Sequence, residues 1–257
     1  MKGRFLGRPL PLVIAHRGFS ALFPENTLPA FEAAVAEGAD MIELDVTASR
    51  DGHPVVIHDD TLERTTTGMG RVGDYTLAEL KRLDAGGWMG EAFGGTSIPV
   101  LPEVFDAFGG RILINVEIKS DGLCKEESTQ ELMQTVIDLI RRKNLLSSVV
   151  ISSGDYQVLR KVRILDGEVM LAVLGNGPEA NSDVTALVKA VGGLSYNPDQ
   201  ACLTGELVDT LHRAGILVFP WSTLPDNTAA TMERMLKLGA DGFFANDPAL
   251  FRARALR

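Results

Sequence analysis

Short apolar runs rich in β-branched residues alternate with segments of helical periodicity along almost the whole chain. The first run, Leu12–Ala15, precedes a helical pattern at about 27–37, with Asn26 as its predicted N-cap and Gly38 as its predicted stop. The second run is Met41–Val46. From residue 100 onward the alternation is regular, and it predicts strands at 112–118, 149–152, 169–174, 193–196, 216–221 and 242–245.

A helical pattern follows each predicted strand. After the first helix, these patterns cover 101–108, 126–143, 156–165, 183–191, 205–213, 228–238 and a last stretch from Pro248. Eight strand–helix units in 257 residues are typical of a closed (β/α)8 barrel, a fold of about 250 residues. The alternative is an open doubly wound sheet, but no G-x-G-x-x-G follows the first strand. We therefore expect a single α/β domain over residues 1–257, folded as a TIM barrel.

Segment 47–99 interrupts this rhythm and is predicted to be a small insertion after the second strand. Its apolar run at 55–58 follows the second strand too closely for a parallel crossover, which needs about a dozen residues. The pair Asp51-Gly52 between the two runs is a strong hairpin signal. A turn centred there places His58 opposite Asp45, or still near the carboxylates if the register slips by one residue. The remainder contains one predicted short helix at 77–83.

Charged residues gather at the carboxyl ends of the predicted strands, where barrels of this type carry their sites. Glu43 and Asp45 end the second strand, and Glu117 precedes Lys119 by two residues at the end of the third. Side chains at i and i+2 of a strand point the same way. Three inward carboxylates make a hard oxygen site suited to Mg²⁺ or Ca²⁺. A salt-bridge network with Arg17 and Lys119 is the alternative.

Two of the four histidines, His16 and His58, are predicted to lie beside these acids. An unperturbed histidine titrates at about pH 6.5, which suits general acid and base catalysis, although metal ligation is an alternative role. His53 falls in the hairpin turn and His212 on a helix away from the strand ends, so we expect surface or packing roles for both.

Other polar and aromatic residues complete the predicted site. Arg17 and Lys119 bring positive charge to it and, with a cation, suit a phosphate ester. Trp221, at the end of the seventh strand, is either a wall for the substrate or part of the core. Asn246 and Asp247 end the eighth strand.

Composition narrows the class of partner and the location. The net charge of −9 argues against nucleic acid as the main partner, because phosphate binding needs clustered basic residues. The apolar run at 10–15 contains Pro11 and is too short for a signal peptide, and no stretch reaches the ~18 apolar residues of a membrane span. Cys124 and Cys202 are expected to be reduced thiols. We expect a soluble, cytoplasmic protein without membrane insertion, and its oligomeric state is left open.

Several motifs together resemble the glycerophosphodiester phosphodiesterase family: HRG, PENT, the E-x-D of IELDV, VVIHDDTLERTTTG-x-G and N-x-E-I-K. The resemblance is nearly continuous over the first half of the chain. It implies a TIM barrel with a small insertion after strand two. It also implies hydrolysis of a glycerophosphodiester to sn-glycerol 3-phosphate and an alcohol with a divalent cation, Mg²⁺ or Ca²⁺.

The resemblance also implies a role for each site residue. Glu25, in PENT, is implied to lie near the site, where we expect it to orient Arg17 or the ligand. His16 and His58 resemble the acid/base pair of the family. Glu43, Asp45 and Glu117 resemble its metal ligands, and Arg17 and Lys119 resemble its phosphate-side residues. Trp221 matches the tryptophan of strand seven more weakly, and we place it with the substrate-binding residues. Which histidine is the acid stays open, as does the nucleophile, which is either a neighbouring hydroxyl of the substrate or water.

The second half departs from the family pattern at the predicted mouth of the barrel. Ser153-Gly154 stands where Ser-Phe is common, 221–224 reads WSTL where Trp-Thr-Val-Asn is common, and Asn246-Asp247 replaces Thr-Asp. The chemistry is therefore better defined than the alcohol. Three alternative functions are a related barrel phospholipase acting on lysophospholipid or phosphoinositide headgroups, a two-acid glycosidase, and a non-catalytic binder of phosphate ligands.

Overall fold

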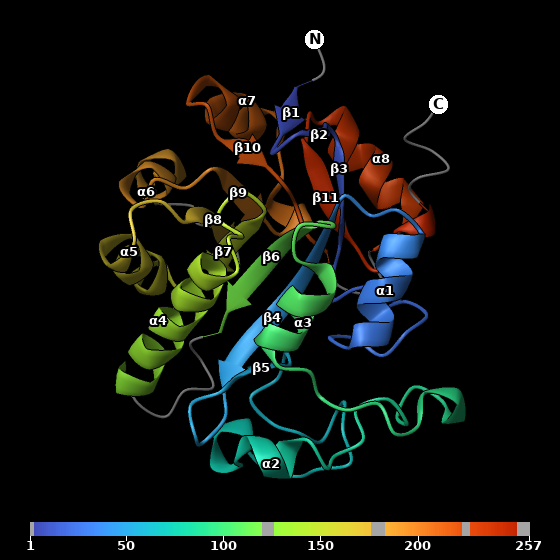
Figure 1. Ribbon diagram of the computed structural model, residues 1–257. Helices are drawn as coiled ribbons and strands as arrows, with labels where there is room; N and C mark the ends of the chain where they lie inside the picture. The colour runs from blue at the N-terminus through green and yellow to red at the C-terminus, as the bar shows by residue number, and fades with distance from the viewer. Residues whose placement is uncertain (1–2, 120–125, 176–182, 223–226, 251–257) are drawn as a thin grey trace.

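The computed structural model describes residues 3–119, 126–175, 183–222 and 227–250, and in these residues the predicted TIM barrel is confirmed (Figure 1). The parallel strands follow the order β10-β9-β8-β7-β6-β4-β3-β11. They are β3 (Leu12–Ala15), β4 (Met41–Ala48), β6 (Leu113–Ile118), β7 (Val149–Ser153), β8 (Met170–Gly175), β9 (Ser195–Pro198), β10 (Leu217–Val218) and β11 (Gly242–Ala245). Hydrogen bonds from Asp241 N to Val218 O (2.9 Å) and from Phe244 N to Pro220 O (3.1 Å) bring the two end strands together.

Helices between the strands cover the outside of the barrel (Figure 1). They are α1 (Leu28–Ala36), α3 (Leu101–Phe108), α4 (Glu126–Arg142), α5 (Tyr156–Leu165), α6 (Val184–Ala190), α7 (Gly205–Arg213) and α8 (Ala229–Lys237). Strand residues such as Ile42, Leu44 and Ile114 belong to the outer core with these helices. Successive strand residues point to opposite faces, so Glu43 and Asp45 share the inward face with Met41. The strand predicted at 216–221 is shorter, and most of the helix predicted from Pro248 lies outside the described residues.

An N-terminal hairpin, β1 (Arg4–Phe5) with β2 (Arg8–Pro9), was not predicted. Phe5 is buried with the inward residues that begin the barrel strands, among them Leu12 and Leu113. Its ring meets Phe219 edge to face, with the centroids 5.5 Å apart. The hairpin therefore closes the amino-terminal end of the barrel, opposite to the end where β4 and β6 point (Figure 1).

Segment 47–99, called the insertion below, lies at the carboxyl end of β4 (Figure 1). It holds β5 (Pro54–Val56), η1 (Val72–Asp74), α2 (Leu77–Leu80) and η2 (Glu91–Phe93). A small core of its own contains Val55, Ile57, Leu62, Leu80 and Ile98. The insertion is thus packed as a unit rather than held by its ends alone.

The hairpin between β4 and β5 is antiparallel as predicted, but its predicted register is wrong by one residue. Val46 pairs with Val56, and Ile57 N donates to Asp45 O (3.1 Å), so Ile57 rather than His58 lies opposite Asp45. Ser49 N donates to His53 O (3.0 Å), which leaves a three-residue loop that ends with Gly52 at φ +79°. His58 follows one residue later and still returns to the carboxylates.

Candidate active site

A cavity of about 390 Å³ opens at the carboxyl ends of the barrel strands. Most of the predicted site residues line it: His16, Arg17, Glu43, His58, Glu117, Lys119 and Trp221. The other two, Glu25 and Asp45, are next to the lining residues and contact the guanidinium of Arg17. The structure therefore brings the predicted residues together although they are far apart in the sequence.

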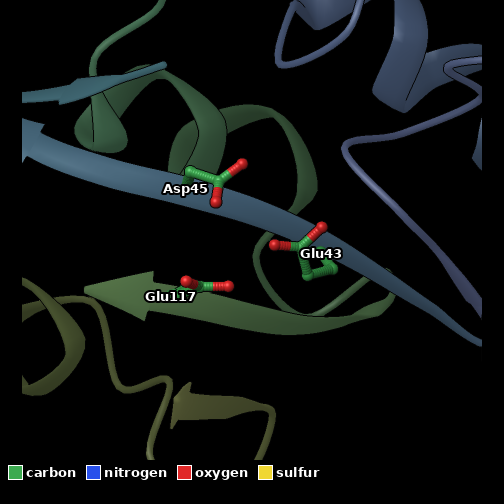
Figure 2. A group of neighbouring side chains, drawn as sticks. All are labelled: Glu43, Asp45 and Glu117. Atoms are coloured by element: carbon green, nitrogen blue, oxygen red, sulfur yellow. The ribbon is translucent and has the colours of Figure 1, made fainter. Parts of the chain in front are cut away.

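Three carboxylates converge on one side of this cavity (Figure 2). Glu43 and Asp45 project from β4 and Glu117 from β6, and the pairing of the two strands sets Asp45 beside Glu117. One oxygen of each acid lies within 4.8 Å of the others. Since a divalent cation takes oxygen ligands at about 2.0–2.6 Å, the three acids can share a single ion.

The electrostatics of the cluster also fit a cation. Burial, together with the charges of Asp45 and Glu117, raises the pKa of Glu43 well above its usual value. Burial and the charge of Asp45 raise the pKa of Glu117 to about 7. Asp45 is buried too, but the charges of Arg17, His58 and Lys119 hold its pKa below the usual value. The basic side chains of the protein thus stabilise the ionised form of Asp45 but not those of Glu43 and Glu117. A bound cation would supply the positive charge that these two carboxylates lack.

Arg17 joins the acids to the loop after β3. Its backbone N donates to Glu43 Oε2 (2.8 Å), its Nε lies 3.4 Å from Asp45 Oδ2, and its Nη1 donates to Glu25 Oε1 (2.9 Å). On the other side, Lys119 Nζ lies 3.4 Å from Glu117 Oε1. The ion pairs foreseen as the alternative to a metal site are therefore present, but they leave the acids in excess.

Asn26 is a site residue that the sequence reasoning misplaced. Its side chain donates to Asp45 Oδ2 (2.8 Å) and accepts from Asp45 N (3.3 Å). The prediction that Asn26 caps the first helix is wrong, because Thr27 is the N-cap and accepts from Ala30 N. Asn26 has φ +57°, a left-handed conformation that asparagine adopts more readily than other non-glycine residues. The sequence signal was its place in the PENT motif.

The two site histidines have different partners. His16 Nδ1 lies 2.8 Å from Asn246 Oδ1, and burial, followed by the charge of Arg17, lowers the pKa of His16 to about 4. His58 Nδ1 lies 2.6 Å from Asp59 Oδ1, and its Nε2 lies 3.4 Å from Lys119 Nζ. The ordinary roles expected for the other two histidines agree with the structure. His53 is exposed, and His212 pairs with Asp241 at 2.8 Å, beyond the amino end of β11.

The other side of the cavity is formed by β7, β8, the segment after β10, the start of α5 and β11. Trp221 Nε1 donates to Gly175 O (3.2 Å), which fixes the indole against β8 with the side chain still lining the cavity. Ser153 and Gly154, which were predicted to lie at the mouth of the barrel, also line this side. The lining residues that were not predicted are Asp155, Tyr156, Leu174 and Phe244. Asp247 does not line the cavity; its side chain accepts from Leu250 N (3.0 Å).

Two further expectations concern the rest of the chain. Among the described residues, no helix is both long and apolar enough to cross a membrane. Cys202 is a free thiol as expected, whereas Cys124, Thr223 and Leu224 lie outside the described residues.

Fold and site together define a (β/α)8 barrel with an acidic centre for a cation next to histidines and basic groups suited to a phosphate ester. Residues 16–250 match the glycerophosphoryl diester phosphodiesterase family. A glycerophosphodiester phosphodiesterase of Caldanaerobacter subterraneus is 41% identical over 238 residues, which cover 92% of this chain and 94% of the relative. A Bacillus subtilis enzyme of the same name is 34% identical over 266 residues, or 97% of this chain and 88% of its own. The chain therefore belongs to this family, whose members are phosphoric diester hydrolases.

Solved structures agree with this assignment. A phosphodiesterase of Oleispira antarctica, in complex with the product sn-glycerol-3-phosphate, has a TM-score of 0.85 and 29% identity, and the match covers 96% of this chain and 98% of that one. A glycerophosphodiester phosphodiesterase of Agrobacterium tumefaciens has a TM-score of 0.79 and 26% identity, and the match covers 94% of this chain and 99% of that one.

Proposed function

We propose that this protein hydrolyses glycerophosphodiesters to sn-glycerol 3-phosphate and an alcohol, using a divalent cation, Mg²⁺ or Ca²⁺. The observation that carries the proposal is the convergence of three acids, two basic side chains and two histidines on one cavity. The family assignment supports the substrate class, as does the product bound to the Oleispira antarctica relative.

Glu43, Asp45 and Glu117 would hold the cation, and Asn26 orients the carboxylate of Asp45. When bound, the cation would stabilise negative charge that develops on the phosphoryl oxygens. Arg17 and Lys119 flank the same cavity, where they bind the remaining phosphoryl oxygens. Because Arg17 is held between Glu25 and the acids, its position is set before the substrate arrives.

His16 is suited to be the general base. Its Nδ1–H donates to Asn246 Oδ1, which leaves the lone pair of Nε2 available. The low pKa of His16, about 4, keeps the ring neutral at physiological pH. The nitrogen then takes the proton of the attacking hydroxyl, which belongs either to the neighbouring carbon of the glycerol or to water.

His58 is suited to be the general acid. Its side chain is 30% exposed, and its Nδ1–H donates to the carboxylate of Asp59, which sets the direction of the imidazole. In the free protein Lys119 Nζ lies 3.4 Å from Nε2. A phosphate group that binds Lys119 draws this ammonium away, Nε2 takes up a proton from solvent, and this proton passes to the oxygen of the leaving alcohol.

The direct test is release of sn-glycerol 3-phosphate from a panel of glycerophosphodiesters that carry choline, ethanolamine, glycerol or inositol. Each is assayed with Mg²⁺, with Ca²⁺ and with a chelator. We expect release with at least one cation, loss with the chelator and recovery when the cation is returned. Release from none of the panel contradicts the proposed substrate class, and full activity in the chelator contradicts the cation.

The same assay separates the alternatives. A lysophospholipid cleaved faster than every soluble diester favours the phospholipase, and cleavage of a glycoside without a cation favours the glycosidase. Cytoplasmic location and the absence of a nucleic-acid partner stay predictions, to be checked by cell fractionation and by a binding titration with DNA and RNA.

A further inference from the structure

Five ionisable side chains, in which basic and acidic groups alternate, form a continuous chain of contacts between the insertion and the loop after β3. In order they are His58, Asp59, Arg64, Glu25 and Arg17. We propose that Arg64, the central member, is a positioning residue: it fixes Asp59 and thereby holds His58 in line to protonate the leaving alcohol. This inference rests on the proposed function, because it assigns a support to the general acid of that reaction.

Arg64 makes a two-pronged contact on each side. Its Nε and Nη2 donate to Asp59 Oδ2 (2.5 Å) and Oδ1 (3.0 Å). Its Nη1 and Nη2 donate to Glu25 Oε2 (2.8 Å) and Oε1 (2.8 Å). The planar guanidinium matches carboxylate geometry in this way, and a lysine ammonium does not. Both acids are therefore fixed in orientation as well as in distance.

These contacts also argue against Arg64 as a phosphate ligand. Four N–H bonds point at the two carboxylates, and a guanidinium has about five in all. Among the described residues that line the cavity, Arg64 is absent whereas Arg17 is present. The side chain of Arg64 is 44% exposed, but those of Glu25 and Asp59 are only 13% and 26% exposed. Arg64 thus lies at the surface and binds two more buried carboxylates, those of Glu25 and Asp59, which in turn contact Arg17 and His58.

The consequence concerns His58. Asp59 Oδ1 accepts from both His58 Nδ1 and Arg64 Nη2, so the carboxylate that orients the imidazole is itself fixed by Arg64. His58 comes from the insertion and Arg17 from the barrel, and the Glu25–Arg64 contact ties the two together. Without Arg64, Asp59 is free to turn and the imidazole loses its fixed direction, whereas the cation ligands on β4 and β6 keep their places.

The test compares two substrates in the holoenzyme with its cation. One is sn-glycero-3-phosphocholine, whose alkoxide needs a proton to leave. The other is the p-nitrophenyl ester of sn-glycerol 3-phosphate, whose aryl oxide leaves without one. We expect Arg64→Gln to lower kcat on the choline ester by roughly 10–100-fold, part of the 10²–10⁴-fold that a general acid supplies, with less than about 3-fold on the aryl ester. His58→Ala should show the same split with a larger loss.

Arg82, an exposed arginine of the same insertion, provides the matched control, and Arg82→Gln should leave both rates unchanged. Thermal unfolding is measured for each variant. If Arg64→Gln does not fold, Arg64→Lys keeps the charge without the fork and should show a weaker form of the same split. Equal loss on both esters, or no loss on either, overturns the positioning role even while wild type and His58→Ala behave as proposed. A wild type inactive on both esters overturns the proposed function itself.

A double substitution sharpens the assignment. If Arg64 acts through Asp59, then Asp59→Asn should produce the same split, and Arg64→Gln added to it should change kcat on the choline ester by less than about 3-fold further. If the loss in kcat of the double variant equals the product of the two single losses, Arg64 acts by a route that does not include Asp59, and the proposal is overturned.

Discussion

The two walls of the cavity differ in chemistry and in origin. The wall built by β3, β4, β6 and the insertion carries both histidines, two basic side chains and the acids of the cation cluster. The opposite wall, built by β7, β8, the segment after β10, the start of α5 and β11, carries apolar and aromatic side chains, the hydroxyls of Ser153 and Tyr156, and a single carboxylate, that of Asp155. The first wall holds charged groups whose positions relative to the substrate must be set closely. The second wall mainly determines the shape and size of the space beside them.

This difference assigns separate tasks to the walls. On the proposed function, the phosphoryl group and the attacking hydroxyl would lie against the charged wall, because that wall holds the histidines, the two basic side chains and the acids that could hold a cation. The leaving alcohol then extends toward the other wall. Changes on the charged wall should lower turnover for every substrate, whereas changes on the opposite wall should alter the relative rates with different alcohols.

The largest effect is expected for Glu43→Gln, which keeps the shape of the side chain and removes its charge. Because the three acids would share one ion in the proposed site, we expect cation affinity to fall and kcat to drop by about 10³-fold or more, corresponding to the several kcal/mol that a bound cation contributes. Calorimetric titration with Mg²⁺ and Ca²⁺, alongside the release assay, measures both.

Asp155→Asn is the matched control from the opposite wall. Its side chain accepts from Gln157 N (2.8 Å) as the N-cap of α5, and asparagine is an equally good cap. We expect cation affinity to stay at the wild-type value and kcat to change by less than about 3-fold. Wild-type cation affinity in Glu43→Gln would remove Glu43 from the cation site.

His16→Ala comes next, with an expected loss in kcat on the order of 10²–10³-fold. A general base acts on the nucleophile, so the loss should be similar with the choline ester and the p-nitrophenyl ester. This distinguishes His16 from His58, whose loss should depend on the leaving group. If His16→Ala spares the aryl ester, the two histidines have exchanged roles and the assignment of base and acid is wrong.

The regular part of the site could be predicted from sequence because strands have simple geometry. Alternating positions and a parallel neighbour are enough to place Glu43, Asp45 and Glu117 together, and the pairing of Asp45 with Glu117 confirms it. The sequence pattern was weaker at the hairpin. It indicated a tight turn, but the choice between two and three loop residues depends on backbone angles. With three loop residues, Ile57 instead of His58 lies opposite Asp45.

The remaining contacts depend on long-range packing that periodicity does not encode. Asn26 looks like a helix cap in sequence, yet its left-handed backbone turns the amide onto Asp45. Arg64 looks like an exposed charge of a Thr-rich segment, and its partner Glu25 lies 39 residues away. The ring of Phe5 closes the barrel from a hairpin too short for any strand pattern. In each case the partner is set by the closed barrel rather than by neighbouring residues.

Cation binding should depend on pH, with a smaller effect than the substitutions above. Glu117 has a pKa of about 7 in the folded protein against its usual 4.5, and the pKa of Glu43 is also raised. At a pH between 4.5 and about 7, Glu117 is therefore protonated in the folded state and ionised in the unfolded chain. The ion-free protein therefore loses stability as pH rises from about 5 to 7. A cation must displace this proton, so its affinity should rise by up to about tenfold per pH unit below 7.

Thermal unfolding at pH 5.5 and pH 8, with and without Ca²⁺ or Mg²⁺, checks this expectation. The increase in unfolding temperature caused by the ion should be larger at pH 8, because added ligand stabilises in proportion to the logarithm of its concentration over Kd. Glu117→Gln should reduce the difference between the two pH values. An increase that is the same at both, in the wild type, would show that no proton leaves the cluster when the ion binds.

The smallest effect, and the sharpest test of the division between the walls, is expected at Trp221. Its indole lies on the cavity and is fixed by the hydrogen bond to Gly175 O, so Trp221→Leu removes a rigid flat surface without touching the charged wall. An aromatic contact contributes about 0.5–1.5 kcal/mol, so kcat/KM should fall up to roughly tenfold for alcohols that pack on the ring and less for glycerol. Trp88→Leu, at the exposed tryptophan of the insertion, is the control. An equal fall in kcat for every substrate of the panel would show that Trp221 acts in the reaction itself, and would contradict the separate roles assigned to the two walls.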